Sequence, residues 1–408
     1  MITCLNRAAV LSFTLLSTAA SSYGQQPVAS FHYDERGSVT RQEQDTNGDT
    51  KMDRWIHYNR QGQIERVEQD VNFDGKPDVI AYYELGKAVR QEIASKNDGQ
   101  VDTWLHFNAA GEIDRKGHDA DRSGKPTLWV YYQKGQPIRS EESTKSSGKA
   151  SRTTYFKDGK INRVEEDTNG DGKADSFSYF ENGQLVKKEL DRKHVGKIDL
   201  WGYYHGGRLV KQDEDLHGKG QVGRVVYFQG DEVIRRDEDT GQRGRMDMIE
   251  TFSQGRLTKR LRDSKAIGKW DTIYYFQDNQ LVREERDTNG DGIFDLRVLF
   301  ENGQIVAQEG DTNGDRRVDV WVKFHDGEQV EQLEDQNYQG KITARYFFKG
   351  GQVVGQESPT NAEPPRISGP FARVEEELQS MTNYGASVAN DKRTATTAFG
   401  VESGAKIK

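Results

Sequence analysis

A single stretch of 24 residues, DTNGDGKADSFSYFENGQLVKKEL (Asp167–Leu190), shows the pattern that decides the fold. It begins with an acidic loop and continues with a short run that ends on Phe180. An Asn-Gly pair follows, and such pairs favour the left-handed backbone of a two-residue β-hairpin turn. A second run, rich in apolar and charged residues, completes the stretch. Because glycine interrupts the pattern so often, sustained helical turns are excluded, and we predict a β-hairpin.

Near-copies of this stretch recur along most of the chain. Their loops begin at Asp45, Asp70, Ala94, Asp119, Ser143, Asp167, Asp191, Asp215, Asp239, Asp263, Asp287, Asp311 and Asp335. From Asp119 onward each step is 24 residues, and the two earlier steps of 25 carry their extra residue in the hairpin turn. The first run of every unit ends on an aromatic residue: Tyr58, Tyr83, Phe107, Tyr132, Phe156, Phe180, Tyr204, Phe228, Phe252, Phe276, Phe300, Phe324 and Phe348. The sequence therefore predicts an all-β fold of tandem 24-residue β-hairpin repeats.

The shape of the sheet follows from where the apolar residues point. The first strand of a unit carries them toward both faces, as in Trp201 beside Tyr203 and Tyr204. A flat single layer would leave one of those faces wet, and strand twist opposes flatness. We therefore predict an extended, curled antiparallel meander or spiral sheet. Its acidic loops should lie along one edge and its tight turns along the other, with the aromatic residues turned inward and largely buried.

The composition also favours a repeat architecture. Apolar residues are 33% and charged residues 30% of the chain, which is too polar for a large closed core. The 17 tyrosines and 17 phenylalanines argue against plain disorder. Repeat folds fit both observations because each unit buries only a thin layer against its neighbours.

Residues 1–24 have the features of a secretion signal peptide. Arg7 supplies the positive start, a short apolar run follows, and small residues precede the expected cleavage site. The run is too short to span a membrane, so we expect no membrane span in the mature chain. Cys4, the one cysteine, lies inside this segment, which leaves the mature chain without disulfides. We expect an exported protein, located in the periplasm, on the outer surface or outside the cell.

The repeat domain should cover residues 25–357, and the pattern stops at Ser358. Residues 358–408 predict a proline-rich linker, a short amphipathic helix and a flexible tail. The helix is indicated by Phe371, Val374, Leu378 and Met381 at helical spacing. We expect it to cover the open edge of the sheet, with docking to a partner as the alternative.

The charge of the chain narrows the class of partner. Without Arg7, 57 basic residues face 66 acidic ones, a net charge of −9. Such a balance disfavours nucleic acid and anionic lipid as main partners. A protein or polysaccharide at the cell envelope is the partner we expect, and the sequence does not identify it.

The acidic loops predict calcium binding. In Asp167–Asp175, loop positions one, three, five and nine are Asp, Asn, Asp and Asp, and we expect the first three to point into the loop. Calcium takes about six to eight oxygen ligands, and alternate carboxylates on a tight turn supply them. Five loops, called the intact loops below, keep all four side chains. They are Asp45/Asn47/Asp49/Asp53, Asp70/Asn72/Asp74/Asp78, Asp167/Asn169/Asp171/Asp175, Asp287/Asn289/Asp291/Asp295 and Asp311/Asn313/Asp315/Asp319.

A turn without metal is the competing interpretation. In other loops positions three and five are lost, yet the first aspartate, the sixth glycine and the closing aspartate persist, as in Asp191, Gly196 and Asp199. Turn geometry and Asx hydrogen bonds explain those three positions. They do not explain why the Asn and the middle Asp occur together, and only between two outer acids. We therefore predict calcium in at least some of the intact loops.

The second strand has a period-two pattern of its own. An apolar residue, a base and an acid follow at every second position, as in Ile64, Arg66 and Glu68, which places all three on one face. Solvated ion pairing across strands is the interpretation we favour, and a ligand-binding charge track is the alternative. His57 and His106 occupy a strand position that is Tyr in neighbouring units, so we interpret them as packing residues.

No enzyme motif is present. The stretch GKGQVG (Gly218–Gly223) matches a dinucleotide fingerprint by letters alone, since it lies between strands with no helix after it. Acidic pairs occur throughout the chain, so none stands out as a glycosidase pair. We predict a protein that is not an enzyme.

Short motifs carry a family resemblance. HYDERGSVTRQEQDTNGD (His32–Asp49) resembles the YD repeats of rearrangement-hotspot (Rhs) and teneurin-type shells, which wind β-hairpins into a spiral. YFENGQLVKKE (Tyr179–Glu189) is similar to MORN-type repeats, which form hairpin meanders. The loop spacing resembles the calcium loops of FG-GAP blades and of thrombospondin type 3 repeats. These resemblances imply a hairpin-repeat fold, and they imply no particular function.

The sequence thus predicts an exported calcium-binding repeat protein that acts as a non-catalytic scaffold or adhesion module. One alternative is a carbohydrate-binding module, because five tryptophans share one strand position. They are Trp55, Trp104, Trp129, Trp201 and Trp321. A second alternative is a seven-bladed propeller, since fourteen hairpins make seven four-stranded blades.

Overall fold

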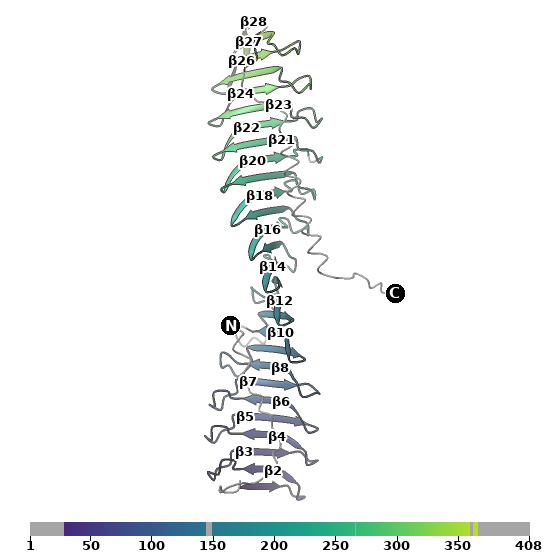
Figure 1. Cartoon of the computed structure of the whole chain (residues 1–408), viewed down its shortest axis with the longest axis vertical. Helices are drawn as coiled ribbons and strands as arrows, with labels where there is room; N and C mark the ends of the chain where they lie inside the picture. Colours follow the sequence, from purple (N-terminus) through teal and green to yellow (C-terminus); the bar gives the residue numbers. More distant parts are fainter. Residues whose placement is uncertain (1–27, 144–148, 266, 360–361, 366–408) are drawn as a thin grey trace, which may run out of the picture. The chain divides into compact units, whose positions relative to one another are not determined.

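The structure, a computed structural model, describes residues 28–143, 149–265, 267–359 and 362–365. The predicted signal peptide and the predicted helix at Phe371–Met381 lie outside the described residues. Two compact units divide the chain, residues 1–174 and 175–408. The strands described in each unit form antiparallel β-hairpins, so the predicted all-β repeat fold is confirmed (Figure 1).

The described residues of the first unit contain twelve strands. They are β1 (Ala29–Tyr33), β2 (Val39–Gln44), β3 (Arg54–Tyr58), β4 (Ile64–Gln69), β5 (Val79–Glu84), β6 (Lys87–Ile93), β7 (Thr103–Phe107), β8 (Ile113–His118), β9 (Leu128–Gln133), β10 (Gln136–Glu142), β11 (Arg152–Lys157) and β12 (Lys160–Glu166).

Sixteen strands lie in the described part of the second unit. They are β13 (Ser176–Glu181), β14 (Gln184–Leu190), β15 (Leu200–His205), β16 (Arg208–Glu214), β17 (Arg224–Gln229), β18 (Glu232–Glu238), β19 (Met248–Ser253), β20 (Arg256–Arg262), β21 (Thr272–Gln277), β22 (Gln280–Arg286), β23 (Leu296–Glu301), β24 (Gln304–Gly310), β25 (Val320–His325), β26 (Glu328–Glu334), β27 (Ala344–Lys349) and β28 (Gln352–Glu357).

The hairpin turns have the backbone that their residues predict. Between β13 and β14, Asn182 and Gly183 both have left-handed φ angles, 51° and 83°. This is the two-residue turn whose twist matches that of the flanking strands. The register of β13 against β14 shifts between Tyr179 and Phe180, just before the turn, and the same irregularity recurs in other hairpins.

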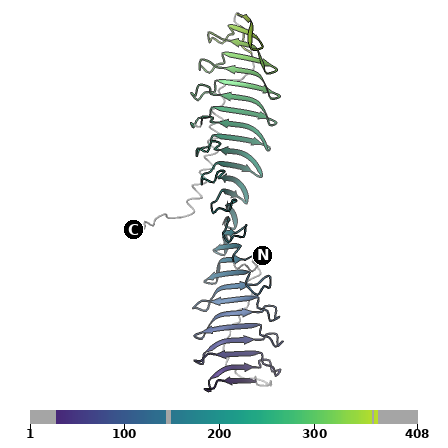
Figure 2. The ribbon, with the colours of Figure 1, turned by 180° about the vertical axis from the view of Figure 1, so that it is seen from behind.

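The predicted curl is wrong for both units. Within the described part of each unit, strands contact only the strands before and after them in sequence (Figure 2). The sheets are therefore open. Half-exposed rings need no enclosed interior here, because long cationic side chains lie over them, as Arg90 does over Tyr82. The aliphatic stems of such side chains can cover apolar surface while the charged heads stay in water.

The same pairing excludes the seven-bladed propeller. Blades would leave strands unpaired at every fourth strand boundary, whereas β4 pairs with β5, β6 with β7 and β8 with β9. Either choice of blade boundary is contradicted by one of these pairings.

The aromatic residues that end each first strand, Tyr58 to Phe348, are all half-buried. The expected burial inside the sheet is therefore wrong, because an open single layer has no interior. Fully buried apolar residues form small local clusters instead, such as Ile249, Leu261 and Ile273 on three adjacent strands, with Phe294 beside them.

Long and short connections alternate strictly. Each acidic loop joins an even-numbered strand to the next odd-numbered one, and each tight turn joins an odd-numbered strand to the next even-numbered one. In an antiparallel meander this places the loops of a unit along one edge and its turns along the other. That prediction is confirmed within each unit. No helix occurs among the described residues, so none of them forms a helix able to cross a membrane.

Candidate functional site

The first aspartate of each acidic loop caps the loop backbone. Asp45 accepts hydrogen bonds from Gly48 N (2.6 Å) and Thr50 N (2.8 Å), one on each carboxylate oxygen. Asp191 does the same in a loop that lacks the calcium pattern, with Gly196 N at 2.6 Å from its Oδ2. Burial raises the pKa of Asp191, but the hydrogen bonds from the loop backbone outweigh it and lower that pKa. The first aspartate is therefore a structural residue in both kinds of loop.

The closing aspartate is also structural. Asp53 accepts hydrogen bonds from Thr46 N at 2.9 Å and from the Thr46 hydroxyl at 2.7 Å. Asp199, in the loop without the calcium pattern, accepts one from Arg192 N at 3.0 Å. Our sequence reasoning missed the second loop position, where a hydroxyl residue often partners the closing acid. The recurrence of Thr or Ser there is the signal that could have revealed it.

The third and fifth positions distinguish the intact loops. Asn47 and Asp49 are exposed and form consecutive Asx turns: Asn47 Oδ1 accepts Asp49 N, and Asp49 Oδ1 accepts Lys51 N, both at 2.8 Å. The Asn47 amide also donates to Asp49 Oδ2 at 3.1 Å. Asn289 and Asp291 repeat the arrangement. The pKa of Asp49 is lowered by its hydrogen bond from the Lys51 backbone first, and then by that from Asn47.

Two further intact loops place the same positions in the same way. Asn169 Oδ1 accepts Asp171 N at 2.9 Å, and Asp171 Oδ1 accepts Lys173 N at 2.8 Å. Asn313 Oδ1 accepts Asp315 N at 2.9 Å, and the Asn313 amide donates to Asp315 Oδ2 at 3.2 Å.

These contacts correct the expected inward orientation. Asn169, Asp171 and Asn313 are all exposed, and each gives an oxygen to a backbone N–H of its own loop instead of pointing inward with the outer aspartates. The physical reason is that short Asn and Asp side chains readily accept from the backbone two residues on, a contact that residue spacing alone does not reveal.

The candidate ligands of the intact loops are of the chemical type that binds calcium, but they are not already arranged around a metal position. Among the described residues, no group of three acidic, histidine or cysteine side chains is gathered closely enough to enclose a metal ion. Every candidate ligand is an oxygen, which is what calcium prefers. Each carboxylate oxygen has two lone pairs, so one hydrogen bond from the backbone leaves a second for a cation. The exposed third and fifth side chains would have to turn toward the outer aspartates.

Two acids of one intact loop oppose each other's charged forms. Burial raises the pKa of Asp319, and the negative charge of Asp311 adds to that rise against the hydrogen bonds from Thr312. A bound cation would favour the charged form of both. Four of the intact loops lie wholly within one unit.

The loop that begins at Asp263 is instead neutralised by a cation at position seven of the preceding loop. The Arg245 guanidinium lies 3.1 Å from Asp263 Oδ2, at the start of the next loop. Lys76 lies over Gly99 in the same way, with its Cδ 3.2 Å from where a Cβ would be. Glycine at position six therefore serves a left-handed backbone and also leaves space for the neighbouring cation.

The charged pattern of the second strand forms contacts with tyrosine. The Arg90 guanidinium carbon lies 4.1 Å from the Tyr82 ring centroid and pairs with Glu92 at 3.1 Å, and the Tyr82 hydroxyl donates to Glu92 at 3.2 Å. The same set recurs at Tyr131/Arg139/Glu141, Tyr155/Arg163/Glu165 and Tyr275/Arg283/Glu285. The ion pairs are thus formed within a strand, and the expectation of pairing across strands is wrong for them. The cause is the period of two, which brings base and acid together on one face.

His57 and His106 lie in the rows of these tyrosines, opposite Arg66 and Arg115. Burial first, and then the nearby arginines, lower the pKa of both histidines. Their interpretation as packing residues is consistent with this position.

The five tryptophans that share one strand position differ in solvent exposure. Trp321 is buried, so it offers no stacking face, while the other four are partly exposed. A Cβ atom at position 117 would lie only 3.0 Å from the Trp129 ring. Glycine therefore leaves the space that this ring occupies. Trp104, on the other side of Gly117, lines a pocket of about 380 Å³.

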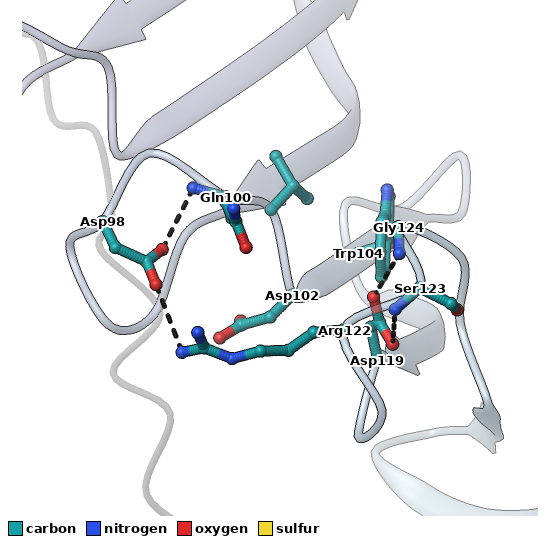
Figure 3. A pocket seen from close by; sticks show the side chains of 9 residues that line it. Asp98, Gln100, Asp102, Trp104, Asp119, Arg122, Ser123 and Gly124 are labelled. Carbon is teal, nitrogen blue, oxygen red and sulfur yellow. Dashed lines mark hydrogen bonds and ion pairs between the residues drawn. The ribbon is translucent and has the colours of Figure 1, made fainter.

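That pocket lies between two neighbouring loops of the first unit (Figure 3). Arg122 reaches from one loop and pairs with Asp98 of the other at 3.2 Å. Gln100 and Asp119 add an amide and a carboxylate to the lining. The pocket therefore combines one aromatic wall with several polar groups.

Known proteins give only distant likenesses. No protein-family model and no curated protein matches the chain. A structure of accessory secretory proteins 1, 2 and 3 of Streptococcus pneumoniae is 20% identical over 22% of this chain and 18% of its own, with a TM-score of 0.20. Structures of TcdB2-TccC3-Cdc42 and TcdB2-TccC3 are each 11% identical. They cover 78% and 84% of this chain and 24% and 27% of their own, with TM-scores of 0.15 and 0.14. This chain spans less than a third of the length of these structures, and TM-scores this low do not identify a shared fold.

Proposed function

We propose that this chain is an exported, non-catalytic binding scaffold whose intact loops take up calcium. Its open sheets present two long faces without an enclosed interior, a form suited to contact with extended partners at the cell envelope. Calcium would bind the folded chain and stiffen the loop edge.

One observation carries the calcium proposal. In loops with and without the calcium pattern, the first aspartate accepts the same backbone hydrogen bond from the sixth loop residue, as Asp45 and Asp191 show. The turn therefore forms when positions three and five are Lys193 and Val195. The exposed Asn–Asp pair of the intact loops is not needed for the fold, and metal binding gives it a role.

The finer family assignment belongs to the same proposal. We infer hairpin repeats of the YD or MORN kind that carry calcium loops like those of FG-GAP and thrombospondin type 3 proteins. The supporting feature is the order within one repeat: an acidic loop, a strand ending on an aromatic residue, an Asn-Gly turn and a charged strand.

Thermal unfolding with calcium and with chelator tests the proposal. A ligand that binds only the folded state raises its stability by mass action, so calcium should raise Tm. The expected affinity is on the order of 10⁻⁴–10⁻³ M, as in extracellular modules, because no bidentate Glu closes the loop. An unchanged Tm together with no calcium heat in calorimetry would contradict the proposal.

Stoichiometry supplies the matched control. Asp315→Ala removes the fifth-position acid of an intact loop and should reduce the number of bound calcium ions by one. Arg243→Ala changes the same position in a loop that lacks the pattern, and it should leave the number unchanged. Equal losses from both variants would show that the ligand positions are wrongly assigned.

Carbohydrate binding is the second candidate, favoured by the pocket at Trp104. Aromatic faces combined with carboxylate, amide and guanidinium groups suit the alternating apolar and hydroxyl surfaces of a sugar ring. Trp104→Ala should abolish binding on a glycan array. Trp321 is buried, so it offers no comparable binding site. Glycan binding that survives Trp104→Ala would place the site elsewhere.

A further inference from the structure

We propose that the loop Asp70–Asp78 is the highest-affinity calcium site of this chain, an inference that rests on the calcium binding proposed above. The feature that ranks it first is a buried carboxylate oxygen that no protein group satisfies.

Asp78, the closing aspartate of this loop, is 2% exposed. Its Oδ2 accepts hydrogen bonds from Val71 N at 2.9 Å and Asn72 N at 3.2 Å, so the carboxylate faces the start of the loop. Its Oδ1 is buried and has no hydrogen-bond partner. Among the closing aspartates of the intact loops in the described residues, Asp78 alone has this property. Leaving a buried acceptor unsatisfied is unfavourable, and a bound cation would satisfy it.

The cause is one residue at the second loop position. Thr46 and Thr312 donate their hydroxyls to Asp53 and Asp319 at 2.7 and 2.8 Å in two other intact loops. In this loop the second residue is Val71, which has no hydroxyl. The backbone N–H bonds are kept, and only the partner of Oδ1 is missing.

No tethered cation takes the place of that partner. Among the described residues, no Lys, Arg or His forms an ion pair with Asp70, Asp74 or Asp78. Lys76 leans toward Gly99 of the next loop. Within the same described part of the chain, the loops at Asp287 and Asp311 also lack an ion pair, so the free oxygen of Asp78 is what separates this site from them.

Hydrogen bonds already hold two of the other side chains in this loop. Asp70 is held by Phe73 N at 2.7 Å and Gly75 N at 2.6 Å. The Asn72 amide donates to Asn97 O of the next loop at 2.8 Å, and the Asn72 oxygen accepts Asp74 N at 2.9 Å. Such preorganisation reduces what a ligand must order on binding.

Calorimetric titration of the full chain with calcium tests the ranking. Asp74→Asn should abolish the tightest class of sites, whereas the matched variant Asp49→Asn in the first loop should remove a weaker one. Val71→Thr should weaken the tightest class by about tenfold and raise Tm in chelator, because the hydroxyl then satisfies Asp78. Thr46→Val should act in reverse on the first loop, strengthening its calcium binding and lowering Tm in chelator.

The outcomes separate this inference from the proposed function. No calcium heat for any version of the chain would end both. Calcium binding whose tightest class survives Asp74→Asn would overturn only the ranking. The ranking would also fail if Val71→Thr raised Tm in chelator as expected but left calcium affinity unchanged, since that result would separate the free oxygen from metal binding.

Discussion

Arg297 donates a hydrogen bond from Nη1 to Oε2 of Glu309 at 3.2 Å, and both side chains are almost completely buried, at 6% and 0% exposure. Most second strands place the base two residues before the acid, but at Glu309 that position is Ala307. Arg297, at a tryptophan position of the neighbouring strand, supplies the charge instead, and it also lies 3.4 Å from Glu285. Charge balance is thus kept across strands where the pattern within a strand is lost.

Removing this arginine should destabilise the second unit. We expect Arg297→Met to lower the free energy of unfolding by about 3–5 kcal/mol, because the buried Glu309 would lose its cation and the buried Glu285 would keep only Arg283. Denaturant unfolding measures the change. Arg256→Met is the control: Arg256 pairs with Asp278 at an exposed site, where the expected loss is at most about 1 kcal/mol. Equal losses from the two variants would show that burial does not set the strength of these pairs.

Two intact loops carry a strained sixth residue. Thr50 has φ 76° and Arg316 has φ 72°, where the other intact loops have glycine. Left-handed backbone costs a non-glycine residue about 1–2 kcal/mol. Thr50→Gly and Arg316→Gly should each raise the unfolding free energy by about 1 kcal/mol. This is the net gain after subtracting the larger conformational entropy that glycine gives the unfolded chain. Destabilisation by both would show that side-chain contacts at these positions outweigh the strain.

The loop at Ala94 lacks a first aspartate. Ala94 is buried at the position where Asp70 accepts Gly75 N at 2.6 Å, and Gly99 is the equivalent residue here. Ala94→Asp should restore that hydrogen bond to a charged acceptor and stabilise the first unit by about 1 kcal/mol. Thermal unfolding of the variant measures this gain. Ala94→Asn is the control, since it supplies an oxygen without charge and should give a smaller gain; a loss of stability with Ala94→Asp would show that the site cannot accept the carboxylate.

The histidines should make the first unit acid-sensitive. Burial first, and then Arg66 and Arg41, lower the pKa of His57 below its ordinary value of 6.5, although Glu68 opposes this. The unfolded chain therefore binds more protons between the two pKa values, and stability falls as pH drops through about 6.5 toward the folded pKa. His57→Tyr, which copies Tyr82 of the next hairpin, should flatten this dependence in urea unfolding from pH 8 to 5. An unchanged slope would mean that His57 does not contribute.

Local chemistry determined much of this fold in advance. A two-residue turn needs left-handed backbone, so Asn182-Gly183 predicts a hairpin without knowledge of its neighbours. The 24-residue repeat then sets the alternation of loops and turns, and the candidate calcium residues follow from letters at fixed spacing. These features depend on residues close together in sequence, and for that reason they were predictable.

The tertiary structure decided what depends on neighbours across the sheet. Whether the rings need an interior depends on which cation lies over them, as Arg90 does over Tyr82. Whether an acid is satisfied depends on a residue seven positions away or on the next strand, as with Thr46 for Asp53 and Arg297 for Glu309. One oxygen of Asp78 has no partner because the folded loop pairs this carboxylate with Val71, which offers a backbone N–H but no hydroxyl. Hydrogen bonds and ion pairs are short-ranged and directional, so composition and spacing alone do not determine which of them form.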